Sequence, residues 1–67
     1  MGLFKKKPIV FITIMERRRA NMVLDYPKHL PLPRILDRVI FNELHGQVVE
    51  VSHVTTGNVT TISIILD

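Results

Sequence analysis

The clearest pattern of apolar and polar positions lies in the last third of the chain, where segments 47–56 and 59–66 flank Gly57-Asn58. Both segments are rich in β-branched residues, which favour strands. Gly followed by Asn suits a two-residue type II′ turn, because Gly accepts a positive φ at the first central position. The sequence therefore predicts a β-hairpin here.

This turn also predicts a register in which one face of the hairpin is mainly apolar and the other mainly hydroxylated. Thr56 would face Val59 across the turn. Counting outward from this pair gives, for the mainly apolar face, Thr55 opposite Thr60, His53 opposite Ile62, Val51 opposite Ile64 and Val49 opposite Leu66. A shift by one residue would destroy the segregation, so the predicted register is specific.

Segment 33–45 is predicted to form a helix, since its prolines suit a first turn and Gly46 lies where a left-handed cap is common. On a helical wheel, one half carries apolar residues that would pack on the hairpin, namely Ile35, Leu36, Val39, Ile40 and Leu44. Phe41 falls on the opposite half, among Arg34, Arg38 and His45.

Segment 8–15 is predicted to be a strand from its content of Ile, Val, Phe and Thr. Ile9, Phe11 and Met15 would point to one face while Val10, Ile12 and Ile14 point to the other, so both faces favour burial. Segment 21–26 is either a second strand, which returns from a turn at 17–20, or a loop, and a helix over 14–24 is the other alternative. Three prolines make segment 26–33 an extended connector.

Together these elements predict an α+β fold, with a small antiparallel sheet of three to four strands in ββαββ or βαββ order and one helix packed on one face. We expect a single domain over residues 8–67, preceded by a flexible basic segment at residues 1–7. One helix covers only one face of the sheet. A second copy of the chain is therefore expected on the other face, giving a homodimer.

Composition narrows the class of protein. With 67 residues, 46% of them apolar and 22% charged, the chain is too hydrophobic to be disordered and too short for two domains. It has no cysteine, which excludes disulfides, thiolate zinc sites and a cysteine nucleophile, and fits a cytoplasmic location. No apolar run reaches the length of a transmembrane helix and no signal-peptide cleavage site follows the basic start, so no integral membrane segment is expected.

Catalytic and metal-binding patterns do not occur in the sequence. The three histidines, His29, His45 and His53, lack metal-ligand spacing, the acidic residues are scattered, and the glycines form no phosphate-binding loop. We therefore expect neither enzymatic activity nor a metal site nor a cofactor.

Charge is the one global signal of function. Nine Lys and Arg against six Asp and Glu give a net charge of +3 and a pI near 9.8, which favours a polyanionic partner. Two basic triplets flank the predicted first strand. The arginine triplet is the stronger candidate because consecutive arginines in a turn reach several phosphates, although such a turn also serves to discourage edge aggregation. The predicted nucleic-acid-binding residues are Arg17, Arg18, Arg19, Arg34, Arg38, Lys5, Lys6 and Lys7.

The leading hypothesis is thus a small basic, non-enzymatic nucleic-acid-binding or accessory protein that acts as a homodimer. An alternative is a protein-interaction module or inhibitor that uses a strand edge or the Phe41 helix face, with Phe41 and His45 as partner-binding residues. If Phe41 does not bind a partner, it is instead expected to be buried beneath the 26–33 connector. A second alternative is peripheral membrane association, with Leu3 and Phe4 inserting beside the three lysines.

Overall fold

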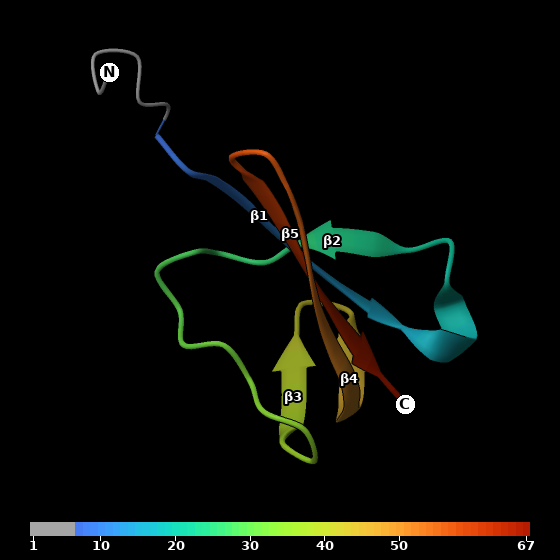
Figure 1. The fold of residues 1–67 in the computed structure, drawn as a ribbon. Helices are drawn as coiled ribbons and strands as arrows, with labels where there is room; N and C mark the ends of the chain where they lie inside the picture. The colour runs from blue at the N-terminus through green and yellow to red at the C-terminus, as the bar shows by residue number, and fades with distance from the viewer. Residues whose placement is uncertain (1–6) are drawn as a thin grey trace, which may run out of the picture.

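The computed structural model describes residues 7–67, which form one curled five-stranded sheet in the order β2-β1-β5-β4-β3 (Figure 1). Strands β1 and β5 are parallel, and the other neighbouring pairs are antiparallel. The elements are β1 (Ile9–Glu16), the short 3-10 helix η1 (Arg17–Arg19), β2 (Val23–Asp25), β3 (Arg38–Phe41), β4 (Leu44–Thr56) and β5 (Val59–Leu66). The predicted roles of Leu3, Phe4, Lys5 and Lys6 lie outside the described residues.

The predicted α+β fold is wrong, because η1 is the only helical segment in residues 7–67 and no helix packs on the sheet. Segment 33–45 instead forms a turn, strand β3 and the start of β4. Along β3, exposed Arg38 and Ile40 alternate with half-buried Val39 and Phe41, which is the two-residue period of a strand. No helix in residues 7–67 has the length and apolar composition needed to cross a membrane.

Two local features explain why a strand forms where a helix was predicted. The segment contains Ile35, Val39 and Ile40, whose β-branched side chains fit a pleated sheet better than a helix. Asn42 adopts a positive φ of 53°, so that Asn42 and Glu43 form a two-residue turn from β3 into β4. The prediction of a helix over 33–45 did not include this turn.

The predicted C-terminal hairpin is confirmed as β4 and β5. Thr56 pairs with Val59 and the predicted register continues through Val51 opposite Ile64, while Gly57 has the positive φ of 63° expected at the first turn position. The predicted pairing of Val49 with Leu66 is wrong. A β-bulge between Val48 and Glu50 adds a residue to β4, so Val48 lies opposite Leu66 instead.

The N-terminal strand is confirmed as β1, and of the alternatives for segment 21–26 the strand is correct, as the three residues of β2. The sheet is nevertheless mixed and not antiparallel as predicted. Residues Ile9–Glu16 of β1 pair in parallel with residues Val59–Leu66 of β5 along their whole length. This pairing makes β5 the central strand.

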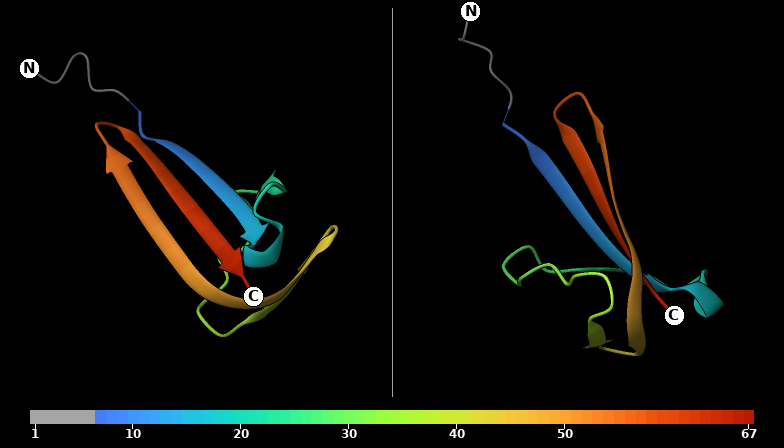
Figure 2. Two further views of the ribbon diagram at one scale, coloured as in Figure 1. Left: turned by 90° about the vertical axis from the view of Figure 1, so that its right-hand side faces the viewer. Right: turned by 60° about the horizontal axis from the view of Figure 1, so that its bottom comes forward.

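The core lies toward the end of the sheet where β1 and β5 finish, and half-buried side chains of β2 and β3 pack against it. Figure 2 shows β4 curving into β3 at this end of the sheet. At the opposite end, the β4–β5 turn and the start of β1 extend away from β2, β3 and the 26–37 connector. The buried core consists of seven aliphatic residues, which are Ile12, Ile14, Leu44, Val48, Ile62, Ile64 and Leu66.

The curl requires a close backbone contact at Gly46. Gln47 and Asp67 exchange two backbone hydrogen bonds of 3.1 and 2.9 Å, which holds the end of β5 against β4. A Cβ atom on Gly46 would lie 2.9 Å from the backbone oxygen of Asp67, and Gly46 has a φ of +154°. Gly46 is therefore a strand residue needed for close approach and not the helix cap that was predicted.

We expect Gly46→Ala to lower the free energy of unfolding by about 2–4 kcal/mol, because it adds a steric clash with backbone to an unfavourable φ. Urea unfolding followed by circular dichroism measures this change. Gly57→Ala is the matched control, since nothing lies within 4 Å of its added Cβ and only the cost of its positive φ, about 1 kcal/mol, applies. Equal losses in the two variants would contradict the close approach at Gly46.

Candidate functional site

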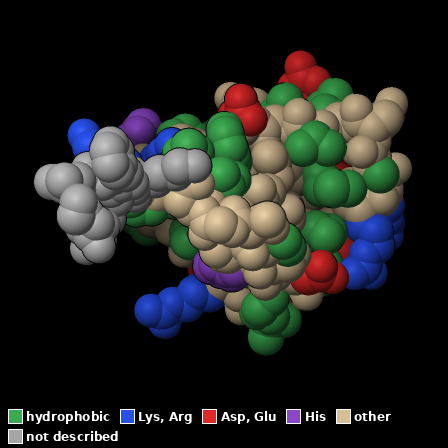
Figure 3. Space-filling model, turned by 45° about the horizontal axis from the view of Figure 1, so that its top comes forward, with side chains coloured by type: hydrophobic (Ala, Val, Ile, Leu, Met, Phe, Trp, Pro, Cys, Tyr) green, Lys and Arg blue, Asp and Glu red, His purple; other side chains and the backbone are tan. Residues whose placement is uncertain are grey.

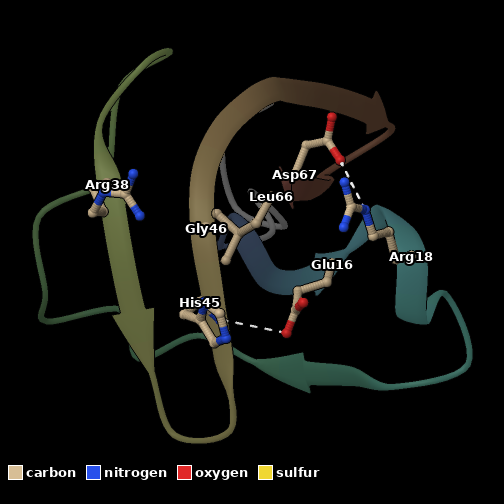
Figure 4. Close-up of a pocket in the computed structure, with 7 residues that line it drawn as sticks. All are labelled: Glu16, Arg18, Arg38, His45, Gly46, Leu66 and Asp67. Carbon is tan, nitrogen blue, oxygen red and sulfur yellow. Dashed lines mark hydrogen bonds and ion pairs between the residues drawn. The ribbon is translucent and has the colours of Figure 1, made fainter.

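A pocket of about 270 Å³ lies at the end of the sheet where β1 and β5 finish (Figure 4). Arg18 from η1, Arg38 from β3 and His45 from β4 line this pocket. Its other lining residues are Glu16, Gly46, Leu66 and Asp67. Three residues that were singled out from the sequence, and that lie in separate segments, thus meet in one place.

Strand pairing explains this meeting. Because β1 and β5 are parallel with Glu16 opposite Leu66, the residues that follow each strand, Arg17 and Asp67, emerge side by side. On the other side of the pocket, the β3–β4 hairpin places Arg38 opposite Gln47 and Ile40 opposite His45. Figure 4 shows Arg18 and Arg38 on opposite sides of the β4 segment that carries His45 and Gly46.

The Asp67 carboxylate is shared by two arginines of η1. Its oxygens lie 3.6 Å from Nη1 of Arg17 and 3.8 Å from Nε of Arg18. The Arg17 and Arg18 side chains are 59% and 86% exposed. Exposed ion pairs contribute at most about 1 kcal/mol, so both guanidinium groups are available to an external anion.

Arg19 makes a different set of contacts, which tie η1 to the turn between β3 and β4. Its Nη1 donates to the backbone oxygen of Glu43 at 3.3 Å and lies 3.5 Å from Oε2 of Glu16. Its Nη2 donates to the sulfur of Met22 at 3.4 Å and lies 4.0 Å from the Glu43 carboxylate. These contacts indicate that Arg19 stabilises the fold, in contrast to Arg18.

Glu16 connects the two sides of the pocket. Besides pairing with Arg19, its Oε2 accepts a hydrogen bond of 3.4 Å from the backbone N–H of His45. The Glu16 side chain is only 14% exposed. Glu16 therefore links η1 to β4, and little of its carboxylate is exposed to solvent.

The remaining predicted nucleic-acid-binding residues are not gathered here. Lys7 precedes β1, at the strand end opposite to η1, and its backbone oxygen accepts a hydrogen bond from Asn58. Arg34 lies in the exposed turn before β3 and does not line the pocket. Arg38 has no ion-pair partner among the described residues. Residues 7–67 contain seven basic and six acidic side chains, so their net charge is only +1.

Phe41 does not provide the exposed aromatic anchor predicted for a helix face. It is half-buried, with its ring centroid 5.3 Å from that of Tyr26. The Tyr26 hydroxyl donates to the backbone oxygen of Pro31 at 2.9 Å, which draws the connector over this ring pair. Phe41 thus packs against Tyr26, the first residue of the 26–33 connector, and is partly covered, while its neighbour Ile40 is 80% exposed.

Glu16 and Asp67 were not predicted as site residues, because neither belongs to a recognisable motif. Their adjacency to the arginine triplet depends on the parallel pairing of β1 and β5, which no local pattern reveals. Within residues 7–67, no group of three His, Asp or Glu side chains is placed to hold a metal ion.

Comparison with known proteins yields no family model, no curated protein and no solved structure that matches this chain. Its function is therefore inferred from its own residues and geometry.

Because Arg19 contacts three other residues, we expect Arg19→Ala to lower the free energy of unfolding by about 1 kcal/mol. Arg18→Ala removes the same charge but only one exposed ion pair, so it should cost less than about 0.5 kcal/mol. Urea unfolding of both variants tests this difference. A loss for Arg18→Ala as large as that for Arg19→Ala would show that the two arginines do not differ in role.

Proposed function

We propose that this chain is a small non-enzymatic binding protein that contacts the phosphate backbone of a nucleic acid. The contact surface is its arginine end, which we define as Arg17, Arg18, Arg38 and His45 where β1 and β5 finish. The observation that carries the proposal is the convergence of Arg18, Arg38 and His45 on one pocket from three separate segments. Arg17 lies beside them and extends the cationic surface along η1.

The guanidinium groups at this end have the chemistry that phosphate recognition needs. Each is a planar group with five N–H donors that match phosphate oxygens bidentately. Arg18 is 86% exposed and held only by a 3.8 Å ion pair, and Arg38 is exposed without an ion-pair partner in the described chain. The imidazole of His45 adds a further hydrogen-bonding group between them.

An extended polyanion fits this arrangement better than a small anion. Glu16 and Asp67 also line the pocket, and their carboxylates oppose the entry of a lone anion. Arg18 and Arg38 lie on either side of β4 (Figure 4), where successive phosphates of one strand can reach them in turn. No Phe or Tyr lines the pocket, so stacking on bases is not favoured and binding should depend little on sequence.

Binding should weaken steeply with salt. If Arg17, Arg18 and Arg38 each neutralise one phosphate of a duplex, the slope of log K against log salt is about −2.7, so affinity falls about 40-fold between 50 and 200 mM salt. Fluorescence anisotropy of a labelled duplex measures this slope. Absence of binding at the lower salt would refute the proposal.

The double variant Arg18→Ala/Arg38→Ala should reduce the magnitude of that slope by about 2 and weaken binding at low salt. Lys28→Ala/Arg34→Ala is the matched control, since it removes the same charge from exposed residues outside the pocket. An equal loss in the control would mean that net charge, and not this end of the sheet, governs binding.

A further inference from the structure

Exposed apolar side chains lie at separate places between polar ones (Figure 3), and Val54 on β4 is among the most exposed at 61%. Val54 belongs to the half of β4 that has a neighbour on one side only. The first half of β4 pairs with β3, and the backbone of Leu36 and Asp37 continues this pairing to Val48. From Val51 to Thr56, β4 pairs with β5 alone within the described chain.

The hydrogen-bond pattern identifies which groups face the open edge. Thr56 and Val59 close a two-residue hairpin, so they form a hydrogen-bonded pair and the Thr56 backbone points toward β5. Because strand residues alternate, the N–H and C=O groups of Val51, His53 and Thr55 point away from β5. Among residues 7–67, no other backbone group hydrogen-bonds to them.

This edge lacks the devices that usually prevent strands from pairing with other chains. Segment 51–56 contains no Lys, Arg, Pro, Asp or Glu and ends at an exposed turn. The other open edges of the sheet are less suited to strand addition. Lys7 and Pro8 lie beside the start of β1, β2 has only three residues and ends at Asp25, and β3 has only four residues and begins at Arg38. The β4 edge is thus the one most suited to strand addition.

We propose that the β4 edge pairs with the β4 edge of a second copy of this chain, antiparallel and about a two-fold axis at Val54. In this register the outward-facing backbones of His53 and Thr55 hydrogen-bond to Thr55 and His53 of the second copy. A dimer of this kind joins two sheets into one, with β4 next to β4.

The side chains of the edge are self-complementary in this register, which favours a second copy over an unrelated strand. Val54 meets its own equivalent on the outer face, and the Ser52 hydroxyl faces the Thr56 hydroxyl of the second copy. No charged side chain lies opposite a like charge, the arrangement that would destabilise such a pair. The pairing is two-fold symmetric and closes at two copies.

The edge pairing does not depend on polyanion binding, but a dimer would bind a polyanion more tightly than a monomer. A homodimer was expected from the two apolar faces of β1, whose Ile9 and Phe11 are 43% and 54% exposed. The open edge places the contact on β4 instead. Two copies would also present two arginine ends to one polyanion, which raises the apparent affinity without new contacts.

Light scattering coupled to size exclusion, applied to the full chain over about a 50-fold concentration range, should show a monomer that converts to a dimer. Thr55→Pro removes an N–H that points away from β5, so it should raise the dimer dissociation constant at least about tenfold while the β-sheet circular dichroism spectrum is unchanged. A monomer at every concentration, or assembly beyond the dimer, would overturn the proposal.

Charge exchange at Val54 tests the two-fold axis directly. Val54→Lys and Val54→Glu should each be monomeric because like charges meet at the axis, and a mixture of the two should form a heterodimer. Phe11→Lys is the control, since Phe11 lies on the same outer face in the row of Val54 but on β1. Dissociation by Phe11→Lys with retention of the dimer in Val54→Lys would move the contact to β1 and refute the edge pairing.

Oligonucleotide binding by the Thr55→Pro variant separates the two proposals. If polyanion binding is correct and the edge mediates dimerisation, this monomer should still bind the duplex with a salt-dependent affinity through Arg18 and Arg38. If the unsubstituted chain forms the dimer but does not bind the duplex, the proposed function is refuted and the edge pairing still stands.

Discussion

The change of partner along β4 is the constraint on which the rest of the molecule depends. Its first residues hydrogen-bond to β3 and its last to β5, and the bulge between Val48 and Glu50 bends the strand between these two pairings. The bend carries Leu44 and Val48 into the core beside Ile64 and Leu66. A sheet of this size without the curl would leave that apolar face open to water, and residues 7–67 contain no helix that packs on it.

The same bend assembles the arginine end. It brings Arg38 and His45 to the place where β1 and β5 finish, and the parallel alignment of those two strands sets Asp67 beside η1. Gly46 lies where these parts meet, because only a residue without a Cβ allows the end of β5 to lie so close to β4. Fold and site therefore have a common origin in backbone packing.

Local signals in the sequence predicted the C-terminal hairpin and strand β1, and included strand β2 among the alternatives, but did not predict strand β3. Gly57-Asn58 specified a hairpin whose register is correct as far as the bulge, which leaves no mark in the alternation of residues. Segment 33–45 misled because its apolar residues fit a helical period and its prolines and Gly46 resemble helix ends, whereas the alternation from Arg38 to Phe41 carried the correct signal. Arg18, Arg38 and His45 were recognisable as candidates, but their convergence depends on contacts between distant segments.

The parallel pairing of β1 with β5 also determines the order in which the molecule is able to form. Ile9 pairs with Val59, fifty residues further along the chain, so the central ladder closes a loop that contains nearly all the other elements. Closing such a long loop is slow, and proteins with such long-range pairings fold more slowly than those built from neighbouring segments. During synthesis, β1 leaves the ribosome with apolar side chains on both faces and cannot pair with β5 until β5 has been synthesised. Nascent β1 is therefore the segment most exposed to aggregation before the sheet closes.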